Sequence, residues 1–239
     1  MTDITETLLQ ADRTLTLVLN GSESLYLDAL AVTATRTAVW LPVALVLLYV
    51  IIRNNNLPGV FLTVAGLGLC VLLSDQIASS VFKPLVARFR PSQDPHLMYL
   101  VRVVNDYRGG LYGFFSSHAA NTVSLAVFFS LVTRHRATAA TLGAWAALCC
   151  WTRVYLGVHY AGDILAGCLC GLVVGTAVWL LWRGVSARLH VAAQPVDGTP
   201  HSSASVSAGG YDTDTLWLLT AAFCATLLYI AFRALFVTV

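Results

Sequence analysis

Long apolar stretches alternate with short polar segments along most of the chain, and this pattern predicts membrane-spanning helices. Several stretches are at or below the roughly 20 apolar residues with which a helix crosses a bilayer. The six predicted spans are residues 38–52, 58–82, 119–132, 137–158, 160–181 and 216–237. We therefore expect an all-α fold, a six-span transmembrane helix bundle.

The N-terminal segment has a different pattern. Residues 4–19 place Leu and Ile at helical intervals, with Asp, Glu and Arg between them. This spacing is typical of an amphipathic helix that lies in the membrane interface. Asn20, Gly21 and Ser22 then end the predicted helix, because this combination favours a turn.

The pattern divides the chain into four parts. Residues 1–34 hold the interfacial helix and its lead-in, and residues 35–183 form a core of five spans that includes a polar outer loop at 83–117. Residues 184–214 are rich in Ser, Gly, Ala and Pro, so we predict a cytoplasmic linker without a core of its own. Residues 215–239 carry the last span.

Composition supports a membrane protein. Of the 239 residues, 57% are hydrophobic and 11% are charged, whereas soluble domains carry about 25% charged residues. The net charge of +2 does not favour nucleic acid as a partner. All six cysteines fall inside apolar runs, which predicts packing residues rather than a disulfide framework or a zinc site.

The basic residues of the short loops predict the orientation. If the spans alternate, one side of the membrane holds Arg53, Arg134, Arg136, Arg183 and Arg188. The positive-inside tendency makes that side cytoplasmic. The opposite side then carries a second basic group, which breaks the tendency and calls for a functional explanation: Lys83, Arg88, Arg90, Arg102 and Arg108.

A first candidate site is the stretch KPLVARFRP. Lys83 and Arg90 are seven positions apart, close to two helical turns, so we expect both cations on one helix face before Pro91 ends the helix. Two fixed cations suit a phosphate group, which arginine binds through two parallel hydrogen bonds. Anchoring to lipid head groups is the alternative interpretation.

A second candidate is GFFSSHAANT, at the start of the third span. Ser116 and Ser117 precede a helix whose first N–H groups are available to an anion, and a serine there also caps the helix. His118 follows, where an imidazole can donate a proton to a departing oxygen. Capping serines beside an interfacial histidine are the alternative.

A third candidate is TRVYLGVHYAGD, between the fourth and fifth spans. Arg153 ends one span, while His159 and Asp163 are four apart and are expected on one helix face. A carboxylate on one ring nitrogen leaves the other free to attack. A structural His–Asp pair is the alternative. We expect Asp75, alone within the second span, to pair with a basic or hydroxyl group.

Alternating spans bring the three candidates to one mouth of the bundle. Their order, K-x6-R-P, then S-x-H, then R-x5-H-x3-D, resembles the type 2 phosphatidic acid phosphatase family, which shares its core with non-specific acid phosphatases and vanadium haloperoxidases. The match covers residues 83–163 by motif. Two positions depart from the family pattern: Ser117 stands where Gly is usual, and Thr152 where Ser is usual.

The resemblance implies a role for each residue. His159 would be the nucleophile that forms a phosphohistidine, Asp163 would orient it, and His118 would be the general acid and later the base. It also implies that neither metal nor any other cofactor is needed. The phosphate-binding residues would be Lys83, Arg90, Arg153, Ser116 and Ser117.

The function so implied is a lipid phosphatase of the bacterial inner membrane, with its site facing outward. Undecaprenyl diphosphate is the first candidate substrate, with phosphatidylglycerol phosphate, phosphatidic acid and lipid A phosphate as alternatives. A lipid phosphotransferase and a non-enzymatic lipid-binding protein are the other hypotheses. The expected partners are a lipid phosphate and the bilayer, and the oligomeric state stays open.

Overall fold

The computed structural model describes residues 2–189, 191 and 206–236, and the regular structure in them is helical. The predicted all-α class is therefore confirmed. A 3₁₀ turn at Thr37–Trp40 leads into α3, and a π-helical segment at Ile77–Phe82 joins α4 to α5. The α-helices are α1 Thr2–Leu19, α2 Leu25–Ala34, α3 Leu41–Asn54, α4 Leu57–Gln76, α5 Lys83–Val86, α6 Ser117–Thr133, α7 Arg136–Tyr155, α8 Ala161–Arg188 and α9 Thr213–Ala234.

The predicted number of six spans is not matched. Within the described residues, four segments are long and apolar enough to cross a membrane: Thr37–Asn54, Leu57–Val86, Ala161–Arg188 and Thr213–Ala234. The helix α6 has only 17 residues, and α7 falls short of the hydropathy of those four. Both pack against other helices of the bundle, so less of their surface needs to be apolar. Sequence periodicity alone does not separate such helices from full spans.

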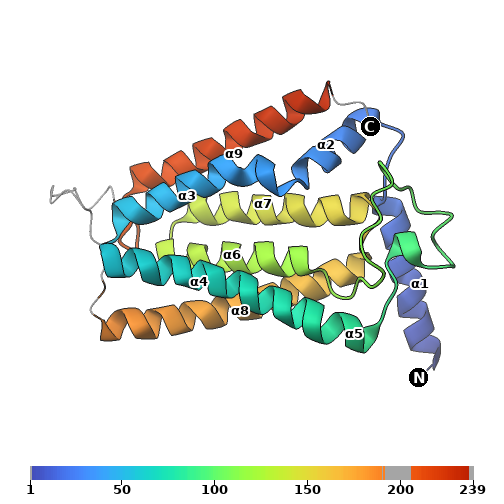
Figure 1. Ribbon diagram of the computed structural model, residues 1–239, viewed down its shortest axis with the longest axis horizontal. Coiled ribbons are helices and arrows are strands. Elements are labelled where there is room, and N and C mark those ends of the chain that lie inside the picture. Colours follow the sequence, from blue (N-terminus) through green and yellow to red (C-terminus); the bar gives the residue numbers. More distant parts are fainter. Residues whose placement is uncertain (1, 190, 192–205, 237–239) are drawn as a thin grey trace.

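The long helices lie side by side, and α1 lies across one end of the bundle (Figure 1). In the centre, α6 packs against α4, α7 and α8, while α9 contacts α2, α3 and α7. The end covered by α1 also holds α5, the start of α6 and the turn between α7 and α8. We call it the site end. The predicted cytoplasmic arginines belong to helix ends and turns at the opposite end.

A row of glycines brings α6 and α8 together. Gly167, Gly171 and Gly175 follow one another at four-residue intervals on α8. A Cβ on Gly171 or Gly175 would lie 2.6–2.7 Å from a backbone oxygen of α6, and a Cβ on Gly167 would lie 2.6 Å from the backbone oxygen of Ser116, which caps α6. Small residues let two helices approach closely in a membrane. The beginnings of α6 and α8 are therefore fixed next to each other.

The segments outside the core extend the sequence analysis. The predicted helix at 4–19 corresponds to α1, and its place in the membrane interface remains a prediction. The helix α2 was not predicted, and α8 continues into the predicted linker as far as Arg188. Residues 190 and 192–205 of that linker, and the predicted end of the last span at Val237, lie outside the described residues.

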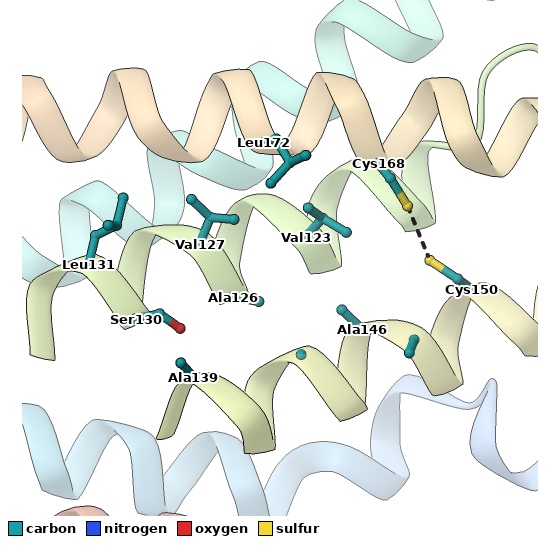
Figure 2. Close-up of a pocket in the computed structure, with 12 residues that line it drawn as sticks. Val123, Ala126, Val127, Ser130, Leu131, Ala139, Ala146, Cys150, Cys168 and Leu172 are labelled. Atoms are coloured by element: carbon teal, nitrogen blue, oxygen red, sulfur yellow. Dashed lines mark hydrogen bonds between the residues drawn. The ribbon is translucent and has the colours of Figure 1, made fainter. Parts of the chain in front are cut away.

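An apolar cavity of about 490 Å³ lies between α6, α7 and α8 (Figure 2). None of the residues predicted for catalysis or phosphate binding lines it. Cys150 and Cys168 border the cavity with their sulfur atoms 3.8 Å apart, well beyond the roughly 2.05 Å of a disulfide bond. The six cysteines are all free.

Candidate active site

Residues of all three predicted motifs meet at the site end. The Ser116 backbone N–H donates to the Asp163 carbonyl at 3.1 Å, which joins the start of α6 to the start of α8. Lys83 Nζ, at the start of α5, donates to Ser117 Oγ at 3.3 Å. These contacts bring three distant parts of the sequence together, as the alternation of spans predicted.

His159 lies in the turn between α7 and α8 and is only 1% exposed. Arg90 Nη1 is 3.0 Å from His159 Nε2 and also donates to the Val158 carbonyl at 2.9 Å. A guanidinium only donates hydrogen bonds, so Nε2 must carry the lone pair. The ring hydrogen then sits on Nδ1, which faces Asp163 Oδ2 at 3.5 Å. This is the tautomer in which Nε2 can attack phosphorus.

The His159–Asp163 pair forms for a different reason from the predicted one. His159 precedes α8, which begins at Ala161, so the two residues do not share a helix face. Asp163 instead turns back toward the chain that enters the helix and accepts the Tyr160 backbone N–H at 3.1 Å. This capping contact holds the carboxylate, which is 0% exposed, next to the His159 ring.

Lys83 and Arg90 also approach the site differently from the prediction of a common helix face. The helix α5 ends at Val86, and Ala87 adopts a left-handed conformation with φ 48°. Arg90 follows in an extended loop, with φ −71° and ψ 154°. The two cations therefore reach the site end from a helix and from a loop.

Asp75 supports Lys83 through a hydroxyl group. Ser79 Oγ donates to Asp75 Oδ1 at 3.3 Å, and Lys83 Nζ donates to the same Ser79 Oγ at 3.0 Å. The three residues are spaced four apart along one helical face. The expectation that Asp75 pairs with a hydroxyl or basic group is met.

Arg153 occupies the last turn of α7 and is 3% exposed. Its Nη1 donates to Thr35 Oγ1 at 2.7 Å, and its Nη2 donates to the Tyr107 hydroxyl at 3.0 Å. Among the described residues, the buried Nε atoms of Arg153 and Arg90 have no hydrogen-bond partner, and no carboxylate forms an ion pair with either guanidinium. Donors for an anion are thus available next to His159.

The start of α6 carries the remaining predicted residues. Ser116 caps the helix, with its Oγ accepting the Ala119 N–H at 3.4 Å. His118 follows in the first turn and is exposed, and within the described part of the chain its ring has no hydrogen bond. An open imidazole at a helix start is suited to exchange a proton with a bound group.

The electrostatic environment keeps His159 neutral. Burial lowers the pKa of His159 well below its usual value, and the charges of Arg90, Arg153, His118 and Lys83 lower the pKa further. All four groups therefore lie within electrostatic range of the ring. A neutral imidazole with a free lone pair is the form that acts as a nucleophile.

Sequence reasoning missed part of the site. Arg88 donates through Nη1 to Asp163 Oδ1 at 2.9 Å and through Nη2 to Asp12 Oδ2 at 2.7 Å. Asp12 comes from α1, a helix predicted only to lie on the membrane. Arg88 was recognised as a basic residue on the disfavoured side, but no spacing rule connects it with Asp12.

In the parts of the chain that the structure describes, no group of three or more His, Cys, Asp or Glu side chains could hold a metal ion. On the Nε2 side of His159, Arg90 supplies a hydrogen-bond donor, and Arg153 lies within electrostatic range of the ring. Such groups suit an anion.

Sequence comparison with known proteins points to one family. Residues 59–186, more than half of the chain, match the family model described as the PAP2 superfamily. A lipid A 4'-phosphatase of Porphyromonas gingivalis is 36% identical over 215 residues, which cover 90% of this chain and 88% of the relative. A lipid A 4'-phosphatase of Bacteroides thetaiotaomicron is 34% identical and covers 77% of this chain and 83% of that protein.

A solved structure shares the fold. The crystal structure of a transmembrane PAP2-type phosphatidylglycerolphosphate phosphatase from Bacillus subtilis matches with a TM-score of 0.53 and 21% sequence identity. The match covers 77% of this chain and 88% of that chain. The helical arrangement around the site is therefore one that a membrane protein of this type is known to adopt.

Proposed function

This chain belongs to the PAP2 superfamily and is a multi-pass membrane phosphatase, and from that premise we propose that it removes a phosphate group from lipid A. The lipid A 4'-phosphatases at 36% and 34% identity support this substrate. They favour the lipid A alternative over undecaprenyl diphosphate, the first candidate from the sequence. Their names also favour the phosphate ester at the 4' position.

One observation supports the proposed phosphate site above all others. Arg90 and Arg153 are buried beside His159, yet their hydrogen bonds go to neutral groups rather than to carboxylates. A buried cation without a counter-ion is unfavourable. A phosphate dianion supplies the missing negative charge and matches the paired donors of arginine.

The proposed reaction has two steps. In the first, His159 Nε2 attacks phosphorus, the bond from phosphorus to the sugar oxygen breaks, and His118 donates a proton to that oxygen. In the second, water attacks the phosphohistidine, His118 takes up the water proton, and the N–P bond breaks to release inorganic phosphate. Lys83, Arg90 and Arg153 stabilise the charge on the phosphoryl oxygens in both steps.

Arg90 has one role before the substrate binds and another during the proposed reaction. Its Nη1 occupies the hydrogen-bonding direction of His159 Nε2, so it marks the position that the phosphoryl group must take. Incoming phosphate oxygens replace Nε2 as the acceptor for Arg90, which frees the His159 lone pair. The cation therefore serves first to orient the ring and then to bind substrate.

The orientation in the membrane is part of the proposal. The arginines at the end opposite the site favour a cytoplasmic location for that end. Examples are Arg134, which caps the end of α6, and Arg136, which begins α7. The site then opens at the outer face of the bacterial inner membrane, where it meets lipid head groups. Labelling of single cysteines placed at the exposed positions Tyr99 and Arg136 in intact cells, with an impermeant maleimide, tests this orientation.

The test of function is a substrate panel with purified protein in lipid nanodiscs. We expect phosphate release from lipid A, with mass spectrometry showing a monophosphorylated product that has lost the 4' phosphate. Undecaprenyl diphosphate, phosphatidylglycerol phosphate and phosphatidic acid serve as competing substrates. His159→Ala should abolish release, and His118→Ala should reduce it by about 10²- to 10⁴-fold, as expected for general acid–base catalysis.

The same panel separates hydrolysis from phosphotransfer. Hydrolysis releases one inorganic phosphate for each lipid A molecule that loses its phosphate, whereas a phosphotransferase produces a phosphorylated acceptor lipid instead. Faster release from undecaprenyl diphosphate than from lipid A would overturn the substrate assignment. Full activity in His159→Ala would overturn the proposed chemistry.

A further inference from the structure

A chain of three charged side chains connects the N-terminal helix to the predicted nucleophile. Asp12 on α1 binds Arg88 at 2.7 Å, Arg88 binds Asp163 at 2.9 Å, and Asp163 faces His159 Nδ1 at 3.5 Å. Arg88 uses Nη2 for one carboxylate and Nη1 for the other. The bridge therefore requires the two-pronged guanidinium, and a single ammonium group would not reproduce it.

Arg88 is held in this position from a third side. Its guanidinium carbon lies 3.7 Å from the centre of the Tyr160 ring. That ring is buried, and its hydroxyl donates to Asp94 Oδ2 at 2.6 Å. The stacked ring and two carboxylates together fix the plane of the guanidinium. They thereby also fix the direction from which Arg88 Nη1 donates to Asp163.

The helix α1 also completes the start of α8. Asp12 Oδ1 accepts the Gly162 N–H at 2.8 Å, and Thr16 Oγ1 accepts the Ala161 N–H at 3.0 Å. The first N–H groups of a helix have no partner within that helix. Here α1 supplies two of those partners, so the first turn of α8, which carries Asp163, is anchored to α1.

We propose that Arg88 and Asp12 are positioning residues, which hold the Asp163 carboxylate where it keeps His159 Nε2 turned toward the phosphoryl group. This inference rests on the proposed phosphatase reaction. Asp163 is fully buried, and a buried carboxylate needs both a counter-charge and hydrogen bonds to stay in place. Arg88 supplies the counter-charge, and Asp12 fixes Arg88 while tying α8 to α1.

The first test compares kinetic constants on the lipid substrate. Arg88→Gln should lower kcat by about 10- to 100-fold, the range found when the partners that orient metal-binding histidines are removed, which act on a ring in the same way. KM should stay within about twofold, because the phosphate-binding cations remain. Arg88→Lys should recover part of the loss, and Asp12→Asn should show a smaller loss of the same kind.

A matched control distinguishes loss of the Arg88 bridge from the mere loss of one positive charge in the outer loop. Arg108 lies in the same outer loop, and its side chain donates to the exposed Asp106 at 2.8 Å and to the Ser92 carbonyl at 3.3 Å. Arg108→Gln should leave kcat unchanged. In the double variant Asp12→Asn with Arg88→Gln, the losses should be less than additive, because both substitutions break one network.

The second test needs no turnover. Nitrogen NMR of ¹⁵N-histidine-labelled protein reports the ring tautomer, and comparison with His159→Gln assigns the His159 signals. The wild type should show hydrogen on Nδ1. In an Arg90→Gln background, where no guanidinium donates to Nε2, adding Arg88→Gln should shift the ring toward a mixture of tautomers. Unchanged kcat in Arg88→Gln, together with unchanged ring signals when Arg88→Gln is added to that background, would overturn the inference. If the wild type hydrolyses no lipid, the proposed function fails, while the ring signals still decide whether Arg88 orients His159.

Discussion

Two groups of basic residues share the site end, and they differ in what they bind. Arg88, Arg102 and Arg108 each lie 2.6–2.9 Å from a carboxylate. The second group, Lys83, Arg90 and Arg153, binds hydroxyl groups, a backbone carbonyl and the His159 ring. Their presence together at the site end thus has two explanations. We call Arg88, Arg102 and Arg108 the structural group, and Lys83, Arg90 and Arg153 the functional group.

The difference shows how a fold prepares a binding site for an anion. A carboxylate next to Arg90 or Arg153 would neutralise the cation and compete with substrate. Neutral acceptors keep the two side chains in place but leave their charge available. The structural group follows the opposite rule: Asp28, for example, is buried and joins Arg102 to the Tyr155 hydroxyl at 2.6 and 2.7 Å.

The largest expected effect is the loss of activity when Arg90 or Arg153 of the functional group is replaced. Arg90→Gln and Arg153→Gln should each lower kcat/KM by about 10²- to 10³-fold, the range for loss of one donor to a developing charge. Steady-state hydrolysis of lipid A, with Arg108→Gln as the control, measures the effect. Equal losses in Arg90→Gln and Arg108→Gln would remove the distinction between the two groups.

The second prediction concerns the missing counter-ion. Inorganic phosphate at about 100 times its dissociation constant should stabilise the protein by roughly 2.7 kcal/mol. For a chain of this size, that corresponds to a rise in Tm of about 5–10 °C in thermal unfolding. The rise should be absent in Arg90→Gln and present in Arg108→Gln. A rise of the same size in Arg90→Gln would show that phosphate binds elsewhere.

The structural group should respond in stability rather than in catalysis. Arg102→Gln leaves the buried Asp28 carboxylate without its cation, and we expect a loss of about 1–3 kcal/mol in the free energy of unfolding. The lower end of that range fits best, because Arg102 itself is 39% exposed. Thermal unfolding measures the loss, and kcat/KM measured alongside should change little. A selective loss of phosphate binding would place Arg102 in the functional group.

The smallest expected effect is a pH dependence of the free energy of unfolding, which the cations of the functional group cause through His159. Its cations and burial lower the pKa of His159 in the folded protein, while an unfolded chain has a histidine pKa of about 6.5. The unfolded state therefore binds the proton first, and stability falls as pH decreases through 6.5. Between pH 6.5 and 5.5 the wild type should lose about 1 kcal/mol more than His159→Gln.

The pH profile of activity provides a second measurement of the His159 titration. Because His159 stays neutral, the acid limb that it causes in the pH profile of kcat/KM should lie below pH 6.5. A limb at or above that value, assigned to His159 by NMR titration, would contradict the environment described for the ring.

The site was largely predictable as a set of residues but not as a geometry. Motif order and alternating spans placed Lys83, His118 and His159 at one end of the bundle, and the structure agrees. Two predicted geometries were wrong. Lys83 and Arg90 do not share a helix, because α5 ends before Arg90, and His159 and Asp163 do not share one, because His159 lies outside α8. Helical spacing is a local rule, whereas the left-handed turn at Ala87 and the cap at Asp163 depend on what packs around them.

The sequence by itself determined the class of the molecule and the candidates for its reactive groups. Apolar runs too long for a soluble domain require a membrane, and the order of three motifs is legible in one dimension. Only the tertiary structure decided which cations are neutralised. Arg88 and Arg90 are two residues apart, yet one binds Asp12 from α1 and the other faces His159. Their different roles arise from contacts over 69 to 76 positions of sequence, which no local pattern encodes.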